Sequence, residues 1–241
     1  MRSLELDNQY LDEGLTDWLR NIAMAAALAA GSETADAKKI PKASQQTVAG
    51  KPEVKHRSST AKPQESLLKV QAKTPTERKN LLKKMAIAAG IRGAELTQFL
   101  AQSSHETRNF ETLEEDGSDQ YFERRYGSDT RKGVDIGNTR PGDGSRYKGR
   151  GFMHLTGKYN YHRIGKTLGL DLVNNPDMVA KYPGVAAATA IAYWKWRVAP
   201  KVKNFGSRGA IEKITQHVTG TAAEKHLERR KKQLKKFQKK P

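Results

Sequence analysis

Apolar side chains recur every three or four residues along most of the chain after residue 74, the period of helices with one buried face. The first such helix has a clear start, because Thr74, Pro75 and Glu77 form a capping box with proline at the first helical position. This helix is predicted to run to about Ala89 and to be stopped by Gly90.

A second helix, over residues 93–107, would place Leu96, Phe99 and Leu100 on one side and Glu106 in its last turn, at the rim of that side. The other ranges with a helical pattern are residues 120–126, 159–168, 185–198 and 209–241. Strand-like alternation is scarce, and residues 151–155 are the best short candidate. The fold class is therefore predicted to be mainly α.

The chain before residue 74 lacks this pattern and divides by composition. Residues 1–37 are acidic and contain an apolar, alanine-rich run. The acidic residues before this run and its short length favour an amphipathic docking helix over a signal peptide or a membrane span. Residues 38–73 are rich in Lys, Ser, Thr, Gln and Pro and nearly free of large apolar side chains before Leu67, which predicts a flexible basic linker. Residues 74–241 are expected to form one domain.

Charge and cysteine content narrow the class of protein. The 241 residues include 44 lysines and arginines against 26 acidic residues. This excess of positive charge favours binding to polyanions, among them nucleic acid, anionic membranes and bacterial cell-wall polymers. The basic C-terminal run has few aromatic residues for base stacking, so a solvated or wall-binding face is favoured and nucleic-acid binding is disfavoured. The absence of cysteine excludes disulfides, Cys-liganded zinc and a thiol nucleophile.

Candidate chemistry is concentrated in two segments. Residues 147–161 form a glycine-rich run that carries a hydroxyl, an amide and tyrosines, and His105-Glu106-Thr107 lies some forty residues upstream. A carboxyl-bearing helix end beside such a turn offers an acid, a held water and polar groups for sugar hydroxyls. A zinc-protease motif is excluded, because Asn109 stands where the second histidine would be needed.

These motifs, taken in order, resemble the glycoside hydrolase family 19 chitinases and are most similar to their bacteriophage endolysin branch. The motifs are His105-Glu106-Thr107, Phe110, Leu113, Glu115, Tyr126-Gly127, Gly137-Asn138, Pro141-Gly142-Asp143-Gly144, residues 147–151, Leu155-Thr156-Gly157 and Tyr159-Asn160-Tyr161. The resemblance covers residues 76–232. It implies a lysozyme-like helical fold with a cleft between two lobes, and an inverting hydrolysis that needs no metal or other cofactor.

By this resemblance Glu106 corresponds to the general acid that protonates the leaving glycosidic oxygen. A glutamate at a helix end among apolar neighbours is also expected to have a raised carboxyl pKa, as an acid catalyst requires. Glu115 corresponds to the second carboxylate, which activates the attacking water. Glu114, Glu123 and Asp129 remain alternatives for this second role.

Thr156 corresponds to the hydroxyl residue that positions the nucleophilic water, and the alternative is a turn threonine that bonds its own backbone. Tyr159 and Asn160 correspond to residues that contact the sugar and its N-acetyl group. His105 and Tyr147 are further candidates for substrate binding, although a histidine in this position is more often structural.

The sequence departs from the family at two places. His154 stands where glutamine is usual, and we keep it as a candidate substrate-binding residue. Thr219 replaces the usual substrate-facing asparagine, and the arginine that follows it in the family corresponds to Arg229 or Arg230, of which Arg229 is taken as the binding candidate.

The expected function is therefore a phage endolysin that hydrolyses β-1,4 bonds between N-acetylmuramic acid and N-acetylglucosamine in peptidoglycan. It would pass from the host cytoplasm to the cell wall during lysis, with residues 1–37 as a segment that docks on a virion or membrane partner, and it would act as a monomer. The alternatives are a chitinase, and a virion structural or nucleic-acid-binding protein with an inactive lysin-like domain. Cationic charge favours the anionic bacterial wall over neutral chitin.

Overall fold

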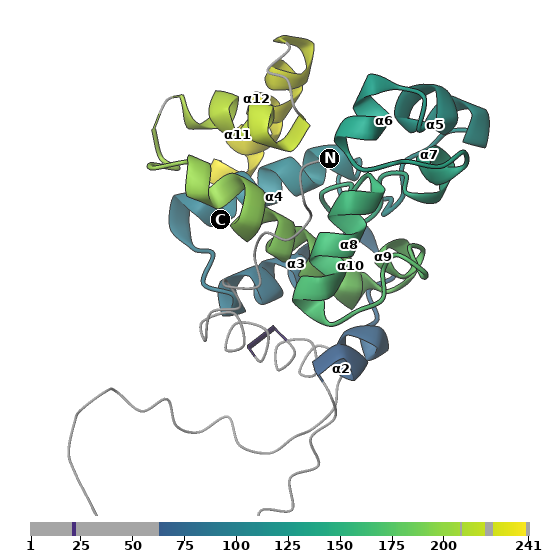
Figure 1. Ribbon diagram of the computed structural model, residues 1–241. Helices are drawn as coiled ribbons and strands as arrows, with labels where there is room; N and C mark the ends of the chain where they lie inside the picture. Colours follow the sequence, from purple (N-terminus) through teal and green to yellow (C-terminus); the bar gives the residue numbers. More distant parts are fainter. Residues whose placement is uncertain (1–20, 23–62, 208, 220–223, 240–241) are drawn as a thin grey trace, which may run out of the picture.

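The computed structural model describes residues 21–22, 63–207, 209–219 and 224–239, and these are mainly helical. Figure 1 shows α4, α11 and α12 on one side, α5, α6 and α7 on the other, and α8 and α10 between and below them. The described residues form no strand, only isolated bridges that pair Arg150 with Glu114 and with Leu155. The predicted mainly α fold class is confirmed. Within the described ranges, every helix is too short or too polar to cross a bilayer.

Most helices follow one another with short connections, and the longest connections between described helices are residues 107–118 and 147–157. In chain order they are α2 (Pro63–Lys69), α3 (Pro75–Ala88), α4 (Gly93–Glu106), α5 (Asp119–Tyr126), α6 (Arg131–Asp135), α7 (Asp143–Arg146), α8 (Lys158–Leu168), α9 (Met178–Lys181), α10 (Pro183–Tyr193), the π-helical η1 (Trp194–Val198), the 3-10 helix η2 (Ala199–Lys201), α11 (Ala210–Thr219) and α12 (Glu224–Lys239).

The core is centred on α10, in which residues 184–192 are all buried. This helix contacts α2, α3, α8 and α9, because its many small side chains let neighbouring backbones approach closely. Gly184 shows how close the approach is, since a Cβ built there would lie 2.4 Å from the carbonyl oxygen of Leu67. Helix α10 therefore holds the lower part of the fold together.

The helix boundaries predicted from sequence agree with the structure to within one or two residues at α3, α4, α5 and α8. The capping box is present, because Thr74 Oγ1 accepts a hydrogen bond from the Glu77 backbone and the Glu77 carboxylate accepts one from Thr74 N. The predicted strand over residues 151–155 is wrong. Gly151 (φ 77°) and His154 (φ 44°) occupy the left-handed region, which folds this segment into a turn.

Residues 63–73 do not form the flexible linker that their composition predicts. They include α2, and Leu67, Val70 and Ala72 are buried in the core. The packed chain therefore begins before Thr74, because the apolar residues at the end of this segment fill the surface of α10. Residues 38–62 lie outside the described ranges. So does the predicted N-terminal helix, except for residues 21–22, which are helical, with Ile22 buried.

We expect Leu67→Ala to lower the free energy of unfolding by about 2–4 kcal/mol, because it removes a buried side chain between α2 and α10. Lys69→Ala on the exposed face of the same helix is the control, with an expected change within about 0.5 kcal/mol. Both are measured by urea denaturation of the full chain. Equal stability of the two variants would mean that α2 is not part of the cooperative fold.

Candidate active site

Glu106 is the last residue of α4, and its side chain is 17% exposed. Arg230 reaches it from α12, which packs along α4. The Arg230 side chain is 1% exposed, and its guanidinium pairs with Glu106 Oε1 and donates to Gln102 Oε1. On the other carboxylate oxygen, His154 Nδ1 lies 3.6 Å from Oε2. Glu106 is therefore held between a C-terminal helix and a central loop.

The pKa of Glu106 departs from the sequence-based expectation. Burial favours the neutral carboxyl and raises the pKa, as predicted. The opposing charges of Arg230, His154 and His105 outweigh burial and hold the pKa below its ordinary value of 4.5. The prediction of a raised pKa is wrong, because the sequence did not show that a buried guanidinium lies against this carboxylate.

The turn after α4 fixes the direction in which the chain leaves Glu106. Arg108, Asn109 and Phe110 all have positive φ, with values of 49°, 62° and 70°, which is unusual for residues other than glycine. Thr107 is fully buried, and its hydroxyl accepts from Phe110 N at 3.0 Å. Arg78 of α3 also donates to the carbonyl of Phe110 at 3.1 Å. This strained turn is thus tied to α3 and α4 on the way to Glu115.

Glu115 is bound to the loop of residues 147–157 through Gly149. The backbone of Glu115 donates to Gly149 O at 2.9 Å, and Gly149 N donates back to Glu115 Oε2 at 3.2 Å. The hydroxyl of Tyr126 donates to Oε1 at 3.1 Å. Burial raises the pKa of Tyr126, and the Glu115 carboxylate raises it further, so the phenol keeps its proton and remains a donor.

Thr156 lies on the same side of Gly149 as the Glu115 carboxylate. A Cβ built at residue 149 would be 2.8 Å from Glu115 Oε2, 3.0 Å from His154 Cβ and 3.2 Å from Thr156 Oγ1, so any residue larger than glycine would crowd all three groups. Thr156 Oγ1 also donates to His154 O at 2.7 Å, which is the backbone-bonding alternative considered for it. Because that bond uses its proton, the hydroxyl oxygen faces other groups as an acceptor.

The structure separates Glu115 from the other three carboxylates considered for the second role. Glu114 faces Lys148 Nζ at 3.1 Å and Arg150 Nε at 3.3 Å. Glu123 accepts from the backbone of Ser145 at 2.7 Å and so fixes the start of α7. Asp129 is exposed beyond α5. Among the four, Glu115 is the carboxylate that the described contacts bring beside Gly149 and Thr156.

Arg150 is a further residue that fixes the loop, and the sequence motifs did not reveal this role. Its guanidinium is buried and pairs with Asp177 at 2.7 Å, besides its contact with Glu114. It also donates to the Tyr161 hydroxyl at 3.1 Å. Asn160 adds a further hydrogen bond to the loop, in which its Nδ2 donates to Thr156 O at 2.7 Å. The loop is thus held in one position before any ligand binds.

Two predicted binding residues lie elsewhere. Tyr147 is only 2% exposed, and its hydroxyl donates to Val173 O at 3.2 Å, so it supports the loop from the core and is not placed to contact a glycan. Arg229 is exposed on α12, whereas its neighbour Arg230 points into the site. His105 lies in the last turn of α4, half-buried beside Glu106, where its charge lowers the pKa of that carboxyl.

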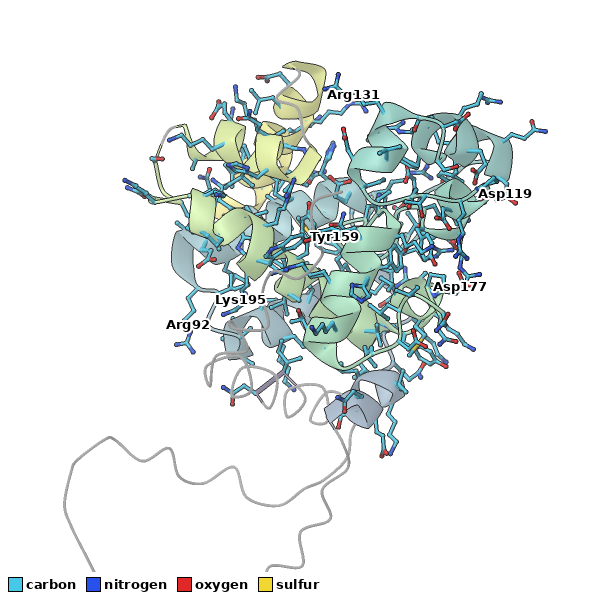
Figure 2. The ribbon with its side chains drawn as sticks, in the orientation of Figure 1. Arg92, Asp119, Arg131, Tyr159, Asp177 and Lys195 are labelled. Atoms are coloured by element: carbon cyan, nitrogen blue, oxygen red, sulfur yellow. The ribbon has the colours of Figure 1, made fainter. Side chains whose placement is uncertain are left out.

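Tyr159 offers an aromatic surface near these residues. It is 42% exposed, and its ring centroid lies 6.2 Å from that of Trp196 in η1. Trp196 in turn packs edge-on against Tyr193 at 6.0 Å. In the view of Figure 2, Tyr159 lies between the side formed by α11 and α12 and the side formed by α5, α6 and α7. Such rings suit the apolar faces of sugars.

Comparison with known proteins identifies a family for most of the chain. The model of the chitinase class I family, glycoside hydrolase family 19, matches residues 55–226 and so begins within the predicted linker. Chitinase 11 of Oryza sativa subsp. japonica is 42% identical over 110 residues, which cover 46% of this chain and 39% of the relative. Endochitinase 4 of Solanum tuberosum is 35% identical over 113 residues, which cover 46% and 37%. The chain thus matches about two fifths of these relatives' length.

Solved structures that match the chain include chitinase C from Streptomyces griseus HUT6037, at a TM-score of 0.46 and 22% identity over 61% of this chain and 58% of that one. Another is the family GH19, class IV chitinase from Zea mays, at a TM-score of 0.47 and 20% identity over 67% and 78%. Because the family model spans more than half of the residues, this chain belongs to the chitinase class I family, glycoside hydrolase family 19.

Proposed function

We propose that this chain is a glycoside hydrolase that cleaves β-1,4 bonds of an N-acetylhexosamine polymer with inversion at the anomeric carbon. The observation that carries the proposal is that Glu115 Oε2 and Thr156 Oγ1 both lie beside Gly149, 2.8 Å and 3.2 Å from a Cβ built there, so that one water between them could contact both. A water there would donate one hydrogen to the carboxylate and one to the hydroxyl oxygen, leaving a lone pair free for attack. Such a carboxylate and held water are what an inverting mechanism requires.

Glu106 is the proposed general acid. Because its pKa is lowered, only a small fraction of Glu106 is protonated near neutrality, and this fraction grows as the pH falls, so catalysis is expected to be favoured on the acid side of neutrality. Binding of a neutral glycan would displace water from this carboxyl and shift its equilibrium toward the protonated form. Arg230 and His154 would then stabilise the carboxylate that remains once the proton has moved to the leaving oxygen.

Peptidoglycan is the proposed substrate. The supporting observation is the formal net charge of +18, because bacterial walls are anionic and chitin is not. Chitin is the second candidate, and the names of the relatives, chitinase and endochitinase, favour it. Action on the wall during phage lysis, after release from the host cytoplasm, extends the peptidoglycan proposal. Its support is the same charge together with the resemblance to phage lysins.

The first test is Glu106→Gln assayed on purified peptidoglycan and on chitin. We expect turnover to fall by at least about 100-fold, because the variant keeps the shape of the side chain and removes its proton. Greater wild-type activity on peptidoglycan would support the lysin, and greater activity on chitin would favour a chitinase. No activity on either polymer would favour the inactive structural protein.

This variant needs a stability control, because it leaves Arg230 buried without its counterion. At pH 7 we expect Glu106→Gln to lower the free energy of unfolding by about 3 kcal/mol. Because the folded pKa of Glu106 is depressed, that difference should shrink as the pH falls below 4.5 and the wild-type carboxylate is protonated. The double variant Glu106→Gln/Arg230→Met should regain stability at pH 7 while staying inactive. Activity that returns with stability would contradict the role of Glu106 as the acid.

The second test is Gly149→Ala. Its Cβ would enter the space between Glu115 and Thr156, so we expect at least a tenfold loss of kcat, about 1.4 kcal/mol, with the fold retained. Gly209→Ala is the matched control, because a Cβ there meets nothing within 4 Å and the backbone is not in the left-handed region. Unchanged kcat in Gly149→Ala would show that this space does not hold the attacking water.

A further inference from the structure

We infer a second glycan-binding site, separate from the active site, in a pocket between the first half of α4, the segment of residues 205–207 and the end of α12. The pocket would take the acetamido group of an N-acetylhexosamine. This inference rests on the proposed function for the identity of the polymer, but not for the chemistry of the pocket. Its volume is about 260 Å³, just below that of sites that enclose drug-sized ligands, which suits one small group with part of its ring.

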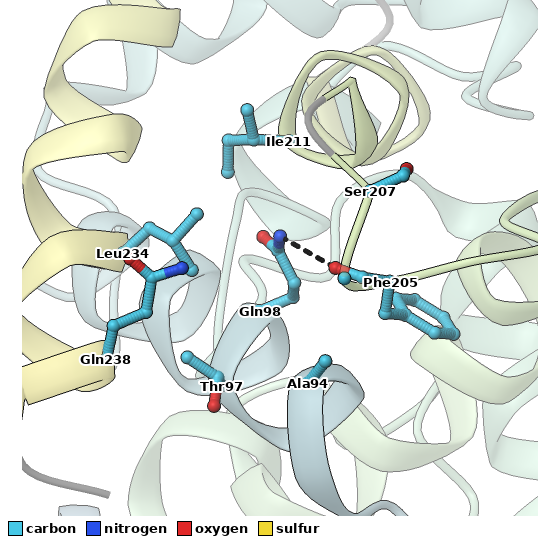
Figure 3. A pocket seen from close by; sticks show the side chains of 9 residues that line it. Ala94, Thr97, Gln98, Phe205, Ser207, Ile211, Leu234 and Gln238 are labelled. Carbon is cyan, nitrogen blue, oxygen red and sulfur yellow. Dashed lines mark hydrogen bonds between the residues drawn. The ribbon is translucent and has the colours of Figure 1, made fainter.

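Gln98 defines the chemistry of this pocket. Its side chain stands in the middle of the lining in Figure 3, with the nitrogen directed toward Phe205 and the oxygen toward the side of Leu234 and Ile211. The residue is 4% exposed, and Nε2 donates to Phe205 O at 3.3 Å. Oε1 is buried and has no hydrogen-bond partner among the described residues. A buried acceptor of this kind is costly unless a donor reaches it.

The rest of the lining selects the kind of donor. Among the described residues, no charged side chain lines the pocket, so this lining offers no charge partner to a carboxylate, a phosphate or an ammonium group. Ala94, Ile211 and Leu234 supply aliphatic surface beside Gln98, while Ser207 and Gln238 are exposed polar residues at its edge. A secondary amide with a methyl group matches this set, because the N–H meets Oε1, the methyl group meets the aliphatic side chains and the sugar hydroxyls face the polar edge.

The pocket lies outside the catalytic contacts but on the same helix. Gln98 and Glu106 are eight residues apart on one face of α4, a rise of about 12 Å, and Gln102 lies between them in contact with Arg230. A ligand at Gln98 therefore does not touch the acid. A polymer that occupied both sites would be held at a raised effective concentration, which increases retention on an insoluble substrate without changing the chemical step.

The test is a nuclear magnetic resonance titration of the full chain with N-acetyl-D-glucosamine. This monosaccharide contains no glycosidic bond and therefore is not cleaved during the titration. We expect the backbone amide signals of Ala94 and Ser207 and the side-chain amide of Gln98 to shift, and D-glucose, which lacks the acetamido group, to leave them unchanged. Gln98→Met keeps the length of the side chain and removes the acceptor, so binding at the pocket should weaken about tenfold. Cleavage of a soluble oligomer should stay at the wild-type rate, while binding to the insoluble polymer should fall.

A second variant guards against a folding effect at the buried position. Ala94→Leu fills the pocket from an exposed helical residue, and it should abolish the shifts at Ser207 and Gln98. Equal shifts with D-glucose, no shift with N-acetyl-D-glucosamine, or shifts only with N-acetyl-L-alanine methylamide would overturn the inference. If the shifts occur but no polymer is cleaved, the binding site stands and the proposed function fails. If polymer is cleaved without the shifts, the binding site fails and the proposed function stands.

Discussion

The buried ion pair between Arg230 and Glu106 links the parts of the structure on which function depends. It fastens α12, a strongly cationic helix, onto α4, and it puts a positive charge against the carboxyl proposed as the acid. An arginine that is 1% exposed is costly to bury, and its pairing with Glu106 and its bond to Gln102 offset that cost. The same contact that orders the C-terminal helix therefore sets the charge of the active site.

The second constraint is the loop of residues 147–157, which is held before substrate arrives. Arg150 ties the loop to Glu114 and Asp177 through ion pairs. Glu115 forms two hydrogen bonds with the backbone of Gly149, one through its own backbone N–H and one through its carboxylate. Rigid placement matters because the two groups proposed to hold water belong to segments some forty residues apart. Glycine at position 149 has no side chain to crowd these two groups, which explains why this position of the loop requires glycine.

Much of the helical framework could be predicted from the sequence, because capping residues and apolar spacing are local signals. Thr74, Pro75 and Glu77 marked the start of α3, and Gly90 its end, as the structure has them. The sequence offered four candidates for the second carboxylate, and a choice among them needed the fold, since neighbouring residues such as Glu114 and Glu115 face different partners.

The features that the sequence did not predict all depend on contacts between distant segments. Adjacent arginines on a helix point about 100° apart, and spacing alone does not tell whether Arg229 or Arg230 faces inward. The lowered pKa of Glu106 follows from that choice. Likewise, the motif around Tyr147 does not reveal that its ring lies in the core. The polar composition of the segment before Thr74 also did not predict that α2 packs on the core, because only a few apolar residues at the end of that segment make the contact.

The stereochemistry of the first product tests the central claim most directly, because a water held by Glu115 and Thr156 must attack from the face opposite the leaving group. Cleavage of a soluble β-1,4-linked N-acetylglucosamine oligomer can be followed by proton nuclear magnetic resonance before mutarotation mixes the anomers. The account predicts that the new reducing end first appears as the α-anomer. A reducing end that first appears as the β-anomer would contradict it, because retention requires a covalent or substrate-assisted intermediate in place of the held water.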